Sequence, residues 1–199
     1  ALNERGYFQP KVEHFHLRQL HSMFQGHPSM HNTPGLDMTS GSLGNGIAIG
    51  AGMAFAAKVQ GKDYATYVIC GDGELQEGVC WEGINMAAGR KLDNLVVFVD
   101  RNGWQSYKSV EFTVGQNNIA DRFRAFGWHT QEISGHDIQA IRSAVHIAKS
   151  HKGSPCCIVC DCVKGKGVSY MENKNAWHKG VPTDEEYAIA VKELGGVQA

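Results

Sequence analysis

The sequence predicts an α/β protein built on a doubly wound parallel sheet with helices on both faces. Four apolar, β-rich runs, at residues 65–70, 95–100, 127–133 and 156–162, alternate with stretches of helical character. Such alternation is typical of βαβ units, whose crossovers place helices against a parallel sheet. Two of the runs are almost continuously apolar, as expected for strands that are covered on both faces.

The first predicted helix, residues 45–59, is rich in Gly and Ala and carries almost no charge before Lys58. A helix of this composition packs its backbone close to a neighbour, either in the core or in another subunit. The strand at 65–70 follows. It leads through a Gly-Asp-Gly turn into a further helix near Glu77.

Two later helices carry stronger signals. Residues 137–150 place Ile138, Ile141, Val145 and Ala148 at helical spacing, with an aspartate at the N-terminal end. Residues 183–194 open with a capping box made by Thr183 and Glu186. Between the last strand and this helix, residues 164–182 form the longest irregular stretch, and long ordered loops are often functional.

Length and composition indicate one globular domain over residues 1–199, with 42% apolar and 20% charged residues. The formal net charge of −1, with ten neutral histidines, gives no basic field for nucleic acid. No apolar run approaches the roughly 18 residues of a membrane span, and the first residues lack the apolar core of a secretion signal. We therefore expect a cytoplasmic protein without a nucleic acid or membrane partner.

Four of the six cysteines, Cys156, Cys157, Cys160 and Cys162, fall in one predicted strand. Reduced core thiols are the simplest interpretation. The C-x-x-C spacing of Cys157 and Cys160 leaves a zinc site as an alternative. Because side chains alternate along a strand, however, Cys157 faces away from the other three, which disfavours a single tetrahedral site.

Polar residues follow two of the predicted strands. Asp72 lies between two glycines after the first strand, and Asn102 follows the next strand 30 residues later (102 − 72). Because the carboxyl ends of parallel strands share one edge of the sheet, where ligands bind, these residues can converge. A carboxylate, an amide oxygen and a backbone carbonyl just after Asn102 are ligands suited to Mg²⁺.

The glycines beside Asp72 have a role in the same hypothesis. Without a Cβ, Gly71 and Gly73 let backbone N–H groups approach a phosphate oxygen closely, and the helix N-terminus near Glu77 favours an anion. An isolated Gly-Asp-Gly is more often an ordinary turn. Two such features at matching strand ends favour a site for a metal ion and a diphosphate.

The stretches GDGELQEG (71–78) and NLVVFVDRNGWQ (94–105) resemble the thiamine diphosphate signature of the transketolase family. The resemblance continues through residues 25–58 and 163–182, so it covers nearly the whole chain. It implies the thiamine diphosphate-binding fold, in the form of the N-terminal, diphosphate-binding half of a transketolase. The cofactors it implies are thiamine diphosphate and Mg²⁺.

The resemblance also assigns roles to individual residues. It implies Mg²⁺ ligands at Asp72, Asn102 and the carbonyl of Trp104. It implies packing of Gly41 and Leu43 on the cofactor's rings. Many members have proline at Ser42. The full set of cofactor-binding positions that it implies comprises Gly41, Ser42, Leu43, Gly71, Asp72, Gly73, Glu74, Asn102 and His178.

Two histidines are the catalytic residues that the resemblance implies. His27 matches a histidine that contacts the sugar hydroxyls and the reacting carbon. His178 matches one that touches the diphosphate and the substrate side of the thiazolium. Glu77 and Glu82 match acidic residues that couple paired cofactor sites across a subunit interface.

The implied activity is transfer of a two-carbon ketol unit from a ketose phosphate to an aldose phosphate. In the family, a glutamate that activates the aminopyrimidine comes from a second, pyrimidine-binding domain. We therefore expect a split-gene transketolase subunit that works with a separate pyrimidine-binding C-terminal subunit, in a hetero-oligomer such as a dimer of heterodimers.

By the resemblance, Ala1 matches a point beyond an upstream family segment that carries two further histidines, so we expect either a native N-terminus that precedes the given sequence or a variant with a reduced site. Alternatives are another thiamine enzyme, similar to deoxyxylulose-phosphate synthase or to a 2-oxo-acid dehydrogenase, and a non-catalytic cofactor-binding subunit.

Overall fold

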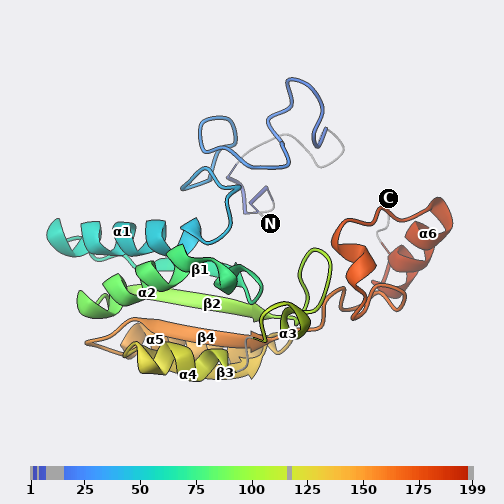
Figure 1. Cartoon of the computed structure of the whole chain (residues 1–199). Helices are drawn as coiled ribbons and strands as arrows, with labels where there is room; N and C mark the ends of the chain where they lie inside the picture. Colours follow the sequence, from blue (N-terminus) through green and yellow to red (C-terminus); the bar gives the residue numbers. More distant parts are fainter. Residues whose placement is uncertain (1, 4, 8–15, 116–117, 197–199) are drawn as a thin grey trace.

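The computed structural model describes residues 2–3, 5–7, 16–115 and 118–196, so both ends of the predicted domain, residues 1 and 199, lie outside the described part. A four-stranded, fully parallel sheet has the order β1-β2-β4-β3 (Figure 1). The strands are β1 (Thr66–Gly71), β2 (Leu95–Arg101), β3 (His129–Ser134) and β4 (Cys156–Asp161). The predicted doubly wound α/β fold is confirmed.

Six α-helices and two short 3₁₀ helices are found in the described ranges. They are α1 (Asn45–Val59), η2 (Glu74–Gln76), α2 (Gly78–Gly89), α3 (Val110–Thr113), α4 (Ile119–Ala125), α5 (Ile138–Ser150), η3 (Asn175–His178) and α6 (Asp184–Glu193). In Figure 1 the strands run towards the lobe that contains α6, so the turns after β1 and β2 and the C-terminal lobe gather at the carboxyl edge of the sheet.

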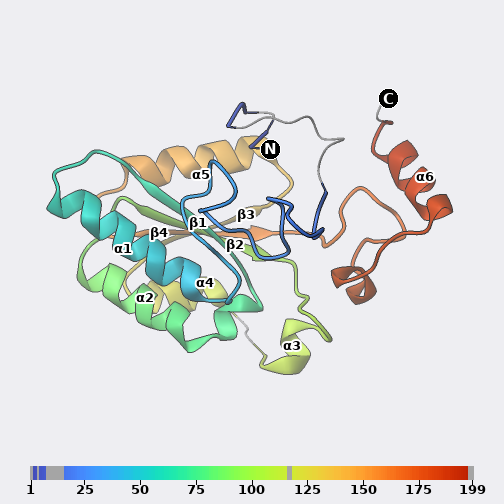
Figure 2. The same cartoon turned by 90° about the horizontal axis from the view of Figure 1, so that it is seen from above.

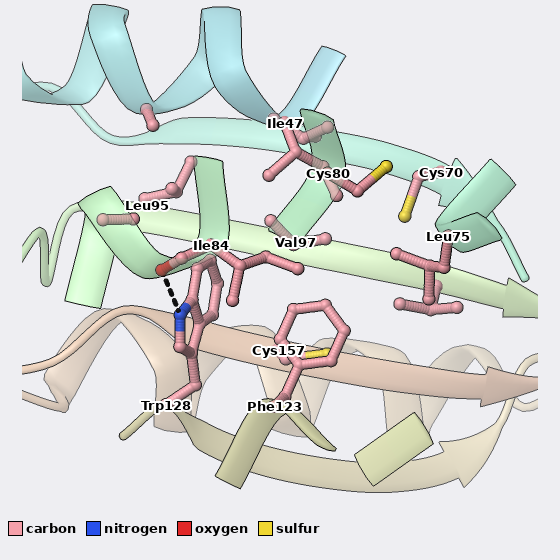
Figure 3. Packing of buried hydrophobic residues seen from close by; sticks show 14 of the residues in the cluster. Ile47, Cys70, Leu75, Cys80, Ile84, Leu95, Val97, Phe123, Trp128 and Cys157 are labelled. Atoms are coloured by element: carbon pink, nitrogen blue, oxygen red, sulfur yellow. Dashed lines mark hydrogen bonds between the residues drawn. The ribbon is translucent and has the colours of Figure 1, made fainter. Parts of the chain in front are cut away.

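The larger core layer lies between the sheet and helices α1, α2 and α4 (Figure 3). Val97 and Cys157 of the two middle strands contact Ile84, Phe123 and other buried side chains there. The indole Nε1 of Trp128 donates a hydrogen bond of 3.0 Å to the carbonyl of Ile84. A buried polar atom is thereby satisfied inside an otherwise apolar layer.

Among the helices in the described ranges, α5 is the one that covers the opposite face of the sheet, as Figure 2 shows. Ala144 and Ala148 of α5 pack on the side chains of β2 and β4. Ile138, predicted as part of the apolar stripe, is 65% exposed. It lies in the first turn of α5, and the buried contact is made by the small alanines further along the helix.

Helices α1 and α2 approach each other closely. A Cβ at Gly83 would lie 3.0 Å from the Cα of Ala48, so only glycine fits without a shift of one helix. Residues of α1 that face the sheet are buried at Ile47, Ala51 and Ala54. The predicted close packing of this helix against the core is confirmed.

Local signals read from the sequence also appear in the structure. The capping box of Thr183 and Glu186 is formed at the start of α6. Cys156 and Cys160 lie in the layer beneath α5 whereas Cys157 lies in the opposite layer, as strand alternation predicts. Burial raises the pKa of the Cys156 thiol to about 11. Within the described ranges, no helix is long and apolar enough to cross a membrane.

Candidate cofactor site

The side chain of Asp72 connects the turn after β1 with the turn after β2. Its Oδ1 accepts a hydrogen bond of 2.9 Å from the N–H of Gly73, and its Oδ2 accepts one of 2.7 Å from the N–H of Gly103. Gly103 directly follows Asn102. The structure therefore brings the two predicted metal-binding turns together at the carboxyl edge of the sheet.

The electrostatics of Asp72 favour a bound cation. The residue is only 2% exposed, and burial raises the pKa of its carboxyl, with the N–H groups of Gly103 and Gly73 partly opposing that rise. Within the described part of the chain it forms no ion pair. A buried carboxylate without a cationic partner is costly, and a metal ion would lower that cost.

The neighbouring ligand atoms are oxygens. The Oδ1 of Asn102 accepts a hydrogen bond of 2.9 Å from the N–H of Trp104, which orients the amide in the turn. Within the described residues, no group of three or more His, Cys, Asp or Glu side chains is arranged to hold a metal ion. A metal site here depends on amide and carbonyl oxygens beside one carboxylate, and this donor set fits Mg²⁺.

The turn after β2 is also tied to the turns on either side of it. The side-chain amide of Gln76 donates a hydrogen bond of 2.6 Å to Oε1 of Gln105, and the side-chain amide of Asn175 donates to the backbone carbonyl of Gln105. The second contact brings η3 of the C-terminal lobe to the strand-end turns. Neither glutamine stands out in the sequence, because nothing in its local pattern differs from an ordinary surface residue.

His178, at the end of η3, faces the turn after β2. Its Nε2 lies 3.4 Å from Oγ of Ser106, and its Nδ1 lies 3.5 Å from Nζ of Lys164. Burial, together with Lys164 and Lys179, lowers the pKa of the His178 imidazole. Sequence reasoning missed Lys164, although its place in a Lys-Gly-Lys-Gly run that opens the long irregular segment was an available signal.

A second group of predicted residues lies on the β1 side. A Cβ built on Gly41 would be 3.0 Å from Nδ1 of His27, so these two residues are neighbours. They line a cleft of about 820 Å³ together with Ser42, Leu43 and Glu74. Asp72, Asn102 and His178 do not line this cleft.

Glu74 links the two groups. It follows the Asp72 turn directly, and its carboxylate accepts hydrogen bonds from the N–H of Gly44 at 2.8 Å and from the N–H of Gly71 at 3.2 Å. Glu77 and Glu82, predicted to couple paired sites, are both exposed at the start of α2. The predicted residues therefore form two clusters, one at the strand-end turns and one around His27, joined through Glu74.

The family model for the transketolase, thiamine diphosphate binding domain matches residues 4–198. Among relatives, the chain is 38% identical to an apulose-4-phosphate transketolase subunit of Phocaeicola vulgatus, over 98% of this chain and 68% of that protein. It is 40% identical to 6-deoxy-6-sulfo-D-fructose transketolase subunit SqwG of a Clostridium species, over 98% of this chain and 70% of that protein.

Solved structures give the same result. The transketolase of Campylobacter jejuni superposes with a TM-score of 0.84 and 33% identity, over 90% of this chain and 29% of that one. Transketolase of Pichia stipitis in complex with a sugar phosphate superposes with a TM-score of 0.85 at 30% identity, over 90% of this chain and 28% of that one. The chain spans less than a third of these solved chains. By its sequence and by its fold, it belongs to the transketolase family and corresponds to that family's thiamine diphosphate binding domain.

Proposed function

We propose that this chain is the diphosphate-binding subunit of a split transketolase that moves a two-carbon ketol unit between sugars. One observation carries the proposal. The buried Asp72 carboxylate holds the turns after β1 and β2 together through Gly73 and Gly103, at the edge where a parallel sheet binds ligands. That arrangement lies within a chain of the transketolase family.

In this proposal, the strand-end turns hold Mg²⁺ and the diphosphate. Asp72, Asn102 and the carbonyl of Trp104 are the metal ligands, and the backbone around Gly71 and Gly73 approaches the phosphate oxygens. Gly41, Ser42 and Leu43 lie against the cofactor's rings. When bound, thiamine diphosphate supplies the electron sink for cleavage of a carbon–carbon bond beside a carbonyl.

His178 is suited to act as a neutral hydrogen-bond donor. The ammonium of Lys164 can only donate, so Nδ1 of His178 accepts and its Nε2 carries the proton. The lowered pKa of the imidazole keeps it neutral near pH 7. His178 would thus present an Nε2–H towards a diphosphate or substrate oxygen, and His27 would act from the side of the cleft.

A pyrimidine-binding subunit completes the proposed enzyme, in a dimer of heterodimers in which Glu77 and Glu82 couple the sites. Support comes from two relatives that are named as transketolase subunits. Their names specify a sugar phosphate and a sulfo-sugar, which favours ketoses that carry an anionic group as substrates. The cytoplasmic location predicted from the sequence belongs to the same proposal.

The test is a turnover assay of this chain with its partner subunit, thiamine diphosphate and Mg²⁺. The first donor and acceptor pair is xylulose 5-phosphate with ribose 5-phosphate. The alternative donors are the sugars named for the two relatives, apulose 4-phosphate and 6-deoxy-6-sulfo-D-fructose. We expect ketol transfer that requires both subunits, both cofactors and an aldose acceptor.

Two results would contradict the proposal. Turnover of pyruvate without a sugar donor would identify a different thiamine enzyme. A complex that binds thiamine diphosphate tightly and transfers nothing from any ketose would identify a non-catalytic subunit. Each outcome is read directly from the products, by chromatography of the sugar and acid fractions.

A further inference from the structure

Glu74 holds two separate parts of the site with one carboxylate. It is the first residue of η2, two positions after Asp72. Its Oε1 accepts from the N–H of Gly44, 30 residues away in sequence, and its Oε2 accepts from the N–H of Gly71 at the end of β1. Both carboxylate oxygens therefore have a backbone partner.

The contact at Gly44 lies at the N-terminus of α1. Gly44 is the N-cap of that helix, with φ of 86°, and α1 has neither a side-chain cap nor an acidic residue in its first turn. A negative charge at this position stabilises the exposed N–H groups of the helix. Glu74 supplies that charge from another part of the chain.

Gly44 also packs closely against the residues that follow Glu74. A Cβ at Gly44 would lie 2.7 Å from the Cβ of Glu77 and 2.8 Å from Cγ1 of Val79. Glycine is required there both by the positive φ and by this approach. The Gly41–Leu43 turn directly precedes Gly44, so its position relative to the Asp72 turn depends on the contact with residues 74–79.

We infer that Glu74 is a positioning residue that fixes the Gly41–Leu43 turn relative to the Asp72 turn and so forms the cofactor's seat before the cofactor binds. The family resemblance implies that Glu74 is one of the cofactor-binding residues. Its two oxygens bond N–H groups at the start of α1 and at the end of β1, so its carboxylate acts by connecting these two segments. The inference rests on the proposed function only in naming thiamine diphosphate as the group that is seated.

Two variants and one control test this role. Glu74→Ala removes both contacts, while Glu74→Gln keeps the size of the side chain and one acceptor oxygen. Asp137→Ala is the matched control, because the Asp137 carboxylate accepts from the N–H groups of Gln139 and Ala140 at the start of α5, in a different part of the fold. All three proteins are studied in the assembly in which the wild type is isolated.

The first readout is amide hydrogen exchange without cofactor. We expect exchange at Gly44 and Gly71 to accelerate by at least about ten-fold in Glu74→Ala, by less in Glu74→Gln, and not at all in Asp137→Ala. The second readout is the affinity for thiamine diphosphate at saturating Mg²⁺. We expect a loss of about ten-fold in Glu74→Ala, with kcat recovered at saturating cofactor, because the turns must then be ordered on binding.

Unchanged exchange at Gly44 and Gly71 in Glu74→Ala would overturn the inference, whether or not the protein binds thiamine diphosphate. So would an affinity equal to that of the wild type, or an equal loss of affinity in Asp137→Ala. Failure of the wild type to bind the cofactor would contradict the proposed function instead, and hydrogen exchange alone would then decide the role of Glu74.

Discussion

The two halves of the sheet are covered differently. Strands β2 and β4 are buried on both faces, with helices α1, α2 and α4 on one side and α5 on the other. Strand β1, at the edge, is covered on one face only, and on its other face Ile69 is 78% exposed whereas Ile158 of β4 is fully buried. Two isoleucines in strands of one sheet therefore have opposite surroundings.

This difference in burial means that one half of the sheet mainly stabilises the fold, whereas the other half carries the candidate binding residues. The closed half, which consists of β2, β4 and the helices that cover them, supplies most of the apolar burial that stabilises the fold. The open half, which consists of β1 and the segments that flank it, carries the Asp72 turn, the Glu74 contact and the cleft beside His27. Changes in the closed half should therefore unfold the protein, and changes at the strand-end turns should alter binding without unfolding it.

The largest expected effect is on folding. Ile158→Ala should lower the free energy of unfolding by about 3 to 4 kcal/mol, because it leaves a cavity between two packed layers. Ile69→Ala, the same change on the open half, should alter it by no more than about 0.5 kcal/mol. Urea denaturation of both variants measures the contrast, and equal losses would show that β1 is covered in solution.

Next in size is the effect of Asp72→Asn on binding. The change keeps the shape of the side chain but removes the charge, so we expect Mg²⁺-dependent affinity for thiamine diphosphate to fall by at least about 100-fold. Titration calorimetry measures it. Asp161→Asn is the control at the same edge, where the carboxylate pairs with Arg101. Equal affinities in Asp72→Asn and the wild type would remove Asp72 from the site.

A pH effect is expected at the start of β3, at the end of the sheet opposite to the strand-end turns. His129 stacks on His151 with ring centroids 4.4 Å apart, and its Nε2 is buried without a partner among the described residues. Burial and then His151 lower the pKa of His129. The unfolded chain, with a histidine pKa of about 6.5, binds a proton that the folded chain resists, so stability should fall as pH drops below that value.

Urea midpoints at pH 7.5 and 5.5 test the His129 effect. The wild type should lose more stability on acidification than His129→Gln, which cannot take up a proton there. Identical pH dependence in the two proteins would mean that another group accounts for the loss.

The smallest effect concerns Asp93, which lies just before β2 and bonds to α1 and to the turn before β4. Asp93 accepts from Nζ of Lys58 at 2.7 Å and from the N–H of Gly153 at 3.0 Å. Burial opposes ionisation, but Lys58 and this N–H outweigh it and lower the pKa of Asp93. Lys58→Met should cost about 0.5 kcal/mol at neutral pH, because the pair is partly exposed. A loss above about 2 kcal/mol in thermal unfolding would contradict this ranking.

Most of the fold could be predicted from the sequence because each strand is an apolar, β-rich run that can be recognised without knowing which strands it pairs with. All four strands were found within two residues of their ends. The sequence predicts that β3 starts at Gly127, but Trp128 turns its indole towards Ile84 and the strand begins at His129. The strand order was not predicted, because pairing of β4 between β2 and β3 depends on packing between distant segments.

The candidate site divides in the same way. Asp72 and Asn102 could be picked out because a turn residue at the end of each of two neighbouring strands is a local pattern. The link made by Glu74 could not, since it depends on a contact across 30 residues, and the Lys-Gly-Lys-Gly run marks Lys164 without indicating its contact with His178. The resemblance supplied His27 and His178. Physical reasoning alone gave no preference among ten histidines.

The indole of Trp128, held by Ile84 beside Phe123, has a practical consequence for spectroscopy. Of the four tryptophans, Trp81 and Trp128 belong to the apolar layer, whereas Trp104 and Trp177 lie in the strand-end turn and in η3. Intrinsic fluorescence of this chain is therefore a sum of two populations. The emission of the first pair reports unfolding of the apolar layer, and the emission of the second pair reports changes around the strand-end turns and η3.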